Sequence, residues 1–164
     1  MTKGSEITYT LDLANYDVSL LPHKARERGT AEFRQAVSGH IEKLFRQLGG
    51  ETRILVDDKQ AKVSWHSTGD ADLLSHALDK LNHGDIADAI LLLSLAHSKE
   101  PDNLNILHNL GNALSQAGFM DLAIKHFQRA LEIAPDHNNA RIALGVIYTK
   151  KKEPTKALEY KAIG

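Results

Sequence analysis

The chain has 164 residues, of which 42% are hydrophobic and 25% are charged, and its formal net charge is −1. These values are typical of a soluble globular protein, and neither half carries the basic excess that a polyanion-binding protein needs. The absence of cysteine excludes disulfides, thiolate zinc sites and cysteine nucleophiles. The sequence has no apolar run long enough to cross a membrane and no signal-peptide stretch at its start, so we expect a cytoplasmic protein without membrane contact.

The first part of the chain, residues 1–69, predicts a small α+β unit with the element order β-α-β-β. The expected elements are a strand at 6–13, a loop with a short helix or strand at 14–29, a helix at 31–50 and a hairpin at 52–66. Thr30 can cap the helix, whose apolar residues recur at the helical period. They are Phe33, Val37, Ile41, Leu44 and Leu48, with His40 and Phe45 beside them. In the hairpin, apolar residues alternate on both arms around a turn at Asp57–Gln60.

The second part, residues 70–164, repeats itself every 34 residues. Pro101 and Pro135 are 34 residues apart, and so are Gly84 and Gly118. The same interval separates Ala96 from Ala130, Leu110 from Leu144 and Gly111 from Gly145, and it relates Ala89, Ala123 and Ala157. Each unit predicts two antiparallel helices, because a glycine suits the end of the first helix and a proline stops the second. A helical hairpin cannot bury its apolar face alone, so we expect the units to stack.

This pattern resembles the tetratricopeptide repeat family. The units are 70–103, 104–137 and 138–164, and the second one, "LNILHNLGNALSQAGFMDLAIKHFQRALEIAPDH", carries the Leu-Gly, Gly, Ala, Phe, Ala and Pro of the family pattern. In the first unit Ala77 stands for a glycine and Leu93 for an aromatic residue, and in the third Lys152 replaces the turn glycine. The resemblance implies an all-α array of two full repeats and a truncated third, five helices or five and a stub. The whole chain is then α+β, with the N-terminal unit packed on the array.

The segment 86–97 is apolar on nearly every side, which indicates a helix that is buried on every side. It carries Leu91, Leu92 and Leu95 where the next repeat has Lys125, His126 and Arg129. We expect the N-terminal unit to cover this helix, because a sheet of three strands needs a surface to pack on. Homo-dimerisation through this same surface is the alternative, and the exposed end of the repeats could also form a homo-oligomer. Leu74, Leu78 and Leu81 either lie under the same unit or form an open apolar pocket for a partner.

Residues capable of chemistry do not converge in the sequence. None of the nine histidines has another at the i, i+4 spacing of a helical metal site, so we expect neither a metal nor another cofactor. The adjacent Asp57 and Asp58 suit a turn better than a catalytic pair. No nucleophile elbow, phosphate loop or dinucleotide fingerprint is present, and we expect no enzymatic activity. The basic stretch 23–34 contains interleaved glutamates and no aromatic platform, which favours a solvated face over a nucleic-acid interface.

The resemblance implies that the first helix of each repeat lines a concave groove that holds an extended peptide. The residues at these positions are Asn105, His108, Asn109, Asn112 and Gln116 in the second repeat, and Asn139, Ala143 and Val146 in the third. An asparagine amide donates and accepts hydrogen bonds at once, so it can hold a peptide backbone without selecting its sequence. These amides could equally do no more than solvate a helix face. The absence of lysine and arginine at Asn139 and Ala143 argues against a receptor for the C-terminal carboxylates of chaperones.

Two functions follow from these patterns. The first is a protein–protein interaction module that binds a peptide or a partner domain in the concave groove. The second is an accessory or regulatory part of a larger enzyme or nucleic-acid-associated assembly, with its specific site in the N-terminal unit.

Overall fold

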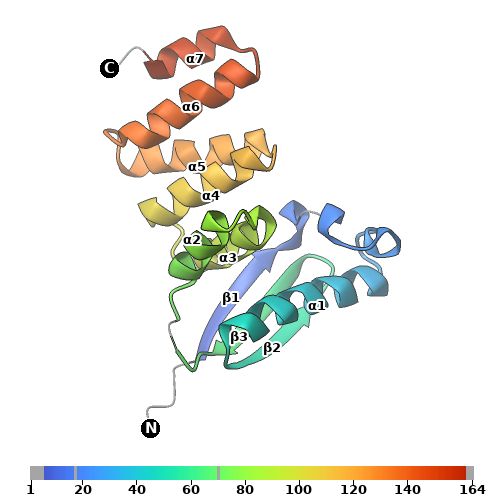
Figure 1. Ribbon diagram of the computed structural model, residues 1–164. Helices are drawn as coiled ribbons and strands as arrows, with labels where there is room; N and C mark the ends of the chain where they lie inside the picture. The colour runs from blue at the N-terminus through green and yellow to red at the C-terminus, as the bar shows by residue number, and fades with distance from the viewer. Residues whose placement is uncertain (1–5, 17, 70, 162–164) are drawn as a thin grey trace. The chain divides into compact units, whose positions relative to one another are not determined.

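The computed structural model describes residues 6–16, 18–69 and 71–161. It shows an α+β chain in which a small antiparallel sheet with one helix is followed by a series of helical hairpins (Figure 1). The chain divides into two compact units, Met1–His76 and Ala77–Gly164.

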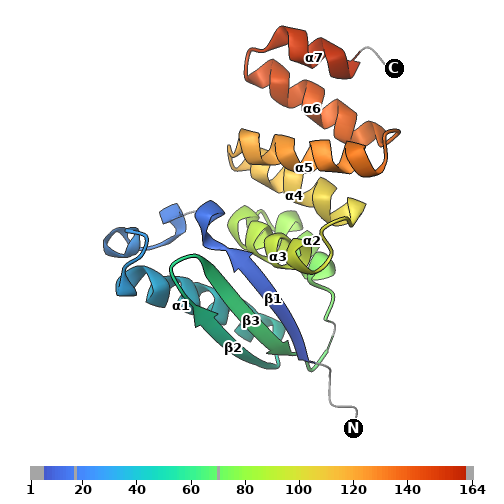
Figure 2. The same ribbon diagram turned by 180° about the vertical axis from the view of Figure 1, so that it is seen from behind.

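The N-terminal unit has the expected β-α-β-β order. Its elements are β1 (Glu6–Asp12), three 3-10 turns (Leu13–Asn15, Val18–Leu20 and His23–Ala25), α1 (Ala31–Leu48), β2 (Glu51–Val56) and β3 (Gln60–His66). The strands pair in the order β1-β3-β2, and both pairings are antiparallel. In the register, Val63 lies opposite Tyr9 on one side and Ile54 on the other. Figures 1 and 2 show α1 across one face of this sheet.

The core of this unit lies between α1 and that face. Val63 and Trp65 are fully buried, and the Phe45 ring meets the Trp65 ring edge to face at a centroid distance of 5.2 Å. The Trp65 indole N–H donates a 2.8 Å hydrogen bond to the carbonyl of Gly49, which ties the end of α1 to β3. The predicted helical stripe is confirmed from Phe33 to Leu44, all of whose members are buried. Its last member, Leu48, is partly exposed, and Phe45 beside the stripe is buried instead.

The loop before α1 is held by arginine side chains that donate to backbone carbonyls. Arg26 donates to Leu21 at 2.9 Å, and Arg28 donates to Leu13 and, at 2.6 Å, to Tyr16. The arginines of the basic stretch therefore satisfy carbonyl groups of their own unit. This use is compatible with the solvated face that the sequence predicts.

The described residues of the second part of the chain form helices joined by short turns. Its helices are α2 (Leu73–Asn82), α3 (Ile86–Lys99), α4 (Leu104–Gln116), α5 (Met120–Ile133), α6 (Asn138–Lys150) and α7 (Pro154–Lys161). They match the prediction of five helices and a stub, since α7 has only 8 residues. Figure 2 shows α4 to α7 as successive antiparallel layers.

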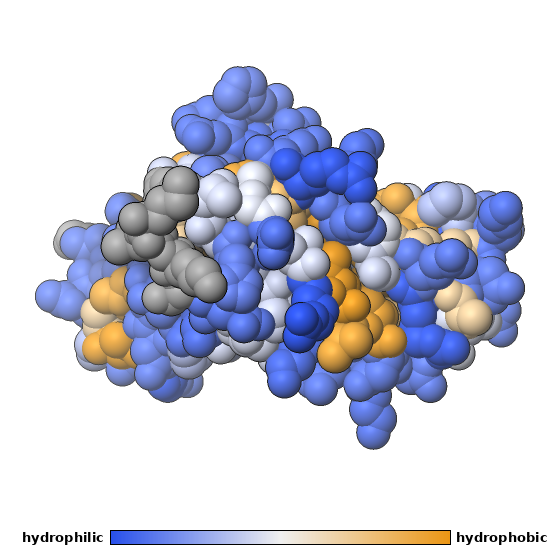
Figure 3. All heavy atoms as spheres, turned by 90° about the horizontal axis from the view of Figure 1, so that it is seen from below, coloured by the Kyte–Doolittle hydropathy of each residue, from blue (hydrophilic) through white to orange (hydrophobic). Residues whose placement is uncertain are grey.

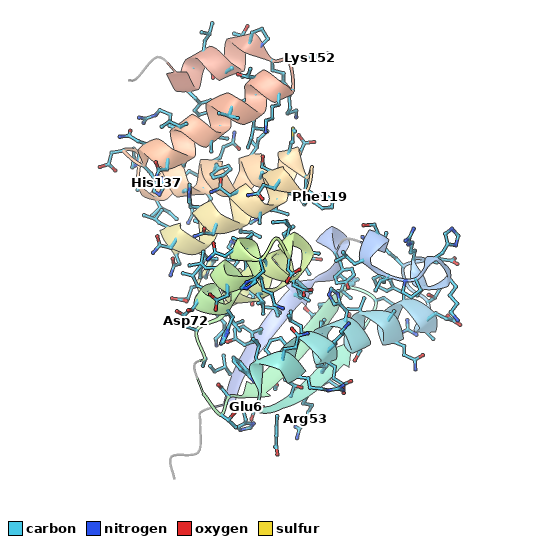
Figure 4. All side chains as sticks on the ribbon, viewed as in Figure 1. Glu6, Arg53, Asp72, Phe119, His137 and Lys152 are labelled. Carbon is cyan, nitrogen blue, oxygen red and sulfur yellow. The ribbon has the colours of Figure 1, made fainter. Side chains whose placement is uncertain are left out.

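Each of the three helical hairpins is closed by the same type of hydrogen-bonded turn. In each, an N–H donates to the carbonyl five residues earlier at 2.9 Å: Asp85 to Lys80, Phe119 to Leu114 and Glu153 to Tyr148. The residue before each donor has a positive φ, which is 79° at Gly84, 91° at Gly118 and 61° at Lys152. Figure 4 labels Phe119 and Lys152 at two successive turns.

Gly111 is the point of close contact between α4 and α5. A Cβ atom added there would lie 2.7 Å from Cζ of Phe127, whose ring is fully buried. A small residue is therefore needed at this helix contact.

Candidate functional site

A groove of about 480 Å³ lies between α4 and α6. Its lining consists of His108, Asn112, Ser115, Phe127, Asn139, Ile142, Ala143, Val146 and Ile147. The helix α4 contributes the face that turns toward α6, and α6 contributes residues spaced three and four apart along one side. Phe127 reaches the groove from α5 and forms part of its base.

The structure brings together five of the eight residues that the sequence singles out. These five are His108, Asn112, Asn139, Ala143 and Val146. The other three, Asn105, Asn109 and Gln116, lie on a neighbouring stripe of α4 and do not line this groove. The stripes differ by three residues, which is about 60° of rotation around a helix. Asn109 instead donates a 2.8 Å hydrogen bond to the carbonyl of Asn105, within its own helix.

Four lining residues are additional to the predicted set: Ser115, Phe127, Ile142 and Ile147. The period of 34 contains a signal for Ile142, since this residue stands 34 positions after His108. It has no such signal for Phe127, because this residue reaches the groove from α5.

His108 is the central polar group of the groove. The Asn112 side-chain nitrogen lies 3.1 Å from His108 Nε2, so with the amide in this orientation Nε2 accepts and Nδ1 carries the proton. Nδ1 is buried and has no hydrogen-bond partner among the described residues. Burial, and then the nearby His137, lower the pKa of His108 below its usual value. The imidazole is therefore neutral at pH 7, where it acts as a polar but uncharged group.

His137 connects the groove to the start of α6. Its Nδ1 accepts a 3.1 Å hydrogen bond from the backbone N–H of Ala140, which caps the helix in place of a serine or aspartate. Its ring centroid lies 5.7 Å from that of His108. Figure 4 places His137 at the turn that leads into α6. This cap fixes the residue at which α6 begins, and thus the position of Asn139 along the groove.

The wall that α6 provides is aliphatic and open to solvent. Ile142 is 62% exposed and Val146 is 46% exposed, although both are large apolar residues. They stand at i and i+4 and so share one face of α6. The α4 wall of the groove is therefore polar, and the α6 wall is aliphatic apart from Asn139 near the start of the helix.

The N-terminal unit contains a second concave region of about 610 Å³, whose lining includes Asp12, Arg28 and Asp58. The charged groups here hold the unit together. Asp12 accepts a 2.9 Å hydrogen bond from the N–H of Ala14, Arg28 donates to carbonyls, and Asp58 pairs with Arg34. Within the described ranges, no three histidine or carboxylate side chains gather as a metal site would require.

No helix within the described ranges has the length and apolar character that a membrane span requires. On the face that Figure 3 shows, hydrophilic residues cover most of the view and apolar residues form separate patches.

Comparison with known proteins gives the family of the repeats. Residues 102–161 match the family model described as tetratricopeptide repeat. Among solved structures, MamA from the strain AMB-1 is similar, with 26% identity, a TM-score of 0.53 and coverage of 55% of this chain and 53% of that one. This chain thus spans about half of the length of MamA.

Two further solved structures share the fold. The type III secretion translocator chaperone SycD of Yersinia enterocolitica is 18% identical with a TM-score of 0.52, and the match covers 54% of this chain and 67% of SycD. A tetratricopeptide repeat protein of Parabacteroides merdae is 20% identical with a TM-score of 0.52 and coverage of 54% and 34%. With the period of 34, the repeated turns and the contact at Gly111, the match to the family model identifies residues 102–161 as tetratricopeptide repeats, and the solved structures share their fold.

Proposed function

We propose that the chain is a protein-interaction scaffold, and that the groove between α4 and α6 binds an extended segment of a partner protein. The observation that carries the proposal is the position of two amides, Asn112 and Asn139, on opposite walls of one groove, with His108 beside them. An extended peptide presents N–H and C=O groups on alternating sides. Two amides that each donate and accept can satisfy these groups without selecting a sequence.

The family and the fold support this role. Tetratricopeptide repeats stack into arrays whose extended concave surfaces serve for binding. SycD, which shares the fold, is described as a chaperone, and a chaperone acts on other proteins. We transfer from this comparison only the general role of a protein that contacts another protein, because identity at this level shows the fold alone.

The proposal is tested with paired variants in a quantitative pull-down. Asn112→Ala combined with Asn139→Ala removes both amides from the groove, and we expect the captured partners to be lost. Asn109→Ala is the matched control, because it removes the same side chain from α4 outside the lining, where the amide bonds to its own helix. Partners that both variants retain equally would show that another surface binds them.

The alternative role places the specific site in the N-terminal unit. The concave region of about 610 Å³ near Arg28 and Lys59 is the observation that favours it. A partner or small molecule bound there should be lost in Lys59→Glu and retained in the Asn112→Ala/Asn139→Ala variant. This pair of results would move the proposed function from the repeats to the N-terminal unit.

A further inference from the structure

The groove positions change chemistry from one repeat to the next. The position of His108 is occupied by Ile142 in the following repeat, and the position of Asn112 is occupied by Val146. One repeat earlier, Leu74 and Leu78 stand there. Leu78 is 38% exposed and Val146 is 46% exposed, so both present apolar surface to solvent. The repeat with polar groups therefore lies between two repeats that are aliphatic at the same positions.

The groove also lacks formal charge. None of its lining residues is lysine, arginine, aspartate or glutamate. His108 is its only titratable side chain, and burial lowers the pKa of that ring, which leaves it neutral at pH 7. A carboxylate or ammonium group that entered would lose water without gaining an opposite charge from the lining, and such burial is costly.

We infer that the groove selects an uncharged, extended segment of a partner protein that places aliphatic side chains against Ile142 and Val146 and its backbone against Asn112 and Asn139. This inference rests on the proposed function and adds the chemical class of the ligand. Exposed aliphatic residues at i and i+4 provide an apolar contact, and the amides of Asn112 on α4 and Asn139 on α6 offer hydrogen bonds to the backbone of the segment.

A peptide segment fits this surface better than a lipid chain or another wholly apolar ligand. An apolar ligand would cover the amides of Asn112 and Asn139 and offer no hydrogen bond to their remaining donor and acceptor sites, which is unfavourable for groups removed from water. A peptide satisfies them with its backbone while its side chains meet the aliphatic wall. Both walls are then used at once.

The test is selection from a library of random peptides displayed on phage against the full chain and three variants. Ile142→Asp places a charge on the aliphatic wall at a residue that is 62% exposed, so folding should tolerate it. Leu158→Asp is the matched control, because Leu158 is 63% exposed and lies on α7 outside the lining. The third variant is Asn112→Ala/Asn139→Ala. Thermal unfolding of each variant checks that it is folded.

We expect enriched peptides with leucine, isoleucine or valine and without acidic residues. Their affinity should fall about tenfold or more in Ile142→Asp, since burial of one aliphatic side chain has this effect on binding. Leu158→Asp should bind them as the wild type does. Enrichment of acidic peptides, or groove-dependent peptides that Ile142→Asp binds equally well, would overturn this inference and leave the proposed function standing. If no enriched peptide depends on Asn112 and Asn139, both fail.

Discussion

Lys152 adopts a backbone conformation that its side chain disfavours. Its φ of 61° is the only positive value at a non-glycine residue among the parts of the chain that the structure describes. The two earlier turns have Gly84 and Gly118 at the same repeat position. A residue with a Cβ pays about 1–2 kcal/mol in the left-handed region.

Lys152→Gly should therefore raise the free energy of unfolding of the repeats by about 1 kcal/mol, reduced somewhat by the greater freedom of glycine in the unfolded chain. Urea unfolding should show a higher midpoint at an unchanged slope. Lys150→Gly is the matched control, because Lys150 is an exposed lysine within α6 and should lose stability on the same change. Equal effects of the two changes would contradict the strain at Lys152.

Gly111 is the opposite case, a position where glycine is required because the Phe127 ring leaves no room for a side chain. Gly111→Ala should destabilise the repeats by about 1–3 kcal/mol, because the new methyl group collides with the Phe127 ring. Gly39→Ala is the control, since Gly39 lies in α1 with no atom within 4 Å of an added Cβ. There alanine should stabilise by about 0.5–1 kcal/mol.

A second substitution at Phe127 should recover part of the stability that Gly111→Ala loses. The first repeat has Ala77 and Leu93 at the positions of Gly111 and Phe127, and both residues are fully buried. Gly111→Ala with Phe127→Leu should therefore lose less stability than the sum of the two single changes. Additive losses in this cycle of unfolding measurements would show that the two positions do not contact each other.

At the scale of elements, two histidines meet where α3 approaches α5. The ring centroids of His97 and His126 are 5.0 Å apart, and the planes are nearly perpendicular. Burial lowers the pKa of His97. Burial, and then the charges of His97 and Lys125, lower the pKa of His126 to about 4. Both rings therefore stay neutral in the folded chain under conditions in which the unfolded chain takes up protons.

The sign of the pH effect follows from that difference. Above about pH 6.5 neither state binds the proton at His126, and its contribution to stability does not change with pH. As the pH falls from 6.5 toward 4, the unfolded state is protonated first and stability decreases, by about 3 kcal/mol in all. His126→Leu, which copies Leu92 of the first repeat, should flatten this part of the profile. An unchanged slope in thermal melts across this range would contradict the prediction.

The elements differ in how far the sequence predicts them. The helices from α2 to α7 follow from the period of 34, because each turn and each helix contact is local and recurs. The loop before α1 has no such rule, since it is held by Arg26 and Arg28 donating to carbonyls up to 15 residues away. The same limit applies in the groove. The sequence predicts that asparagines of α4 line the groove, but it does not give the rotation of α4 about its axis. That rotation places Asn112 in the lining and Asn109 outside it.

At the scale of the whole molecule, α3 is the element whose surface does not suit an exposed position. It carries Leu91 and Leu95 where α5 carries Lys125 and Arg129. Repeats that are otherwise alike thus differ in whether their second helix is charged or apolar on the same side. Such a difference predicts that α3 has a cover which α5 does not need. The sequence offers residues 1–68 for this role, and this assignment remains a prediction.

Deletion of residues 1–68 should therefore expose apolar surface on α3. We expect the truncated chain to aggregate, or to bind a hydrophobic dye that the full chain does not bind. A second truncated chain, with Leu91→Lys and Leu95→Arg, takes the residues of α5 at the same positions and should stay monomeric without binding the dye. Light scattering and dye fluorescence measure both effects. If the first truncated chain is monomeric and dye-silent, residues 1–68 do not cover α3, and the open leucines of α2 become the better explanation for the apolar end of the array.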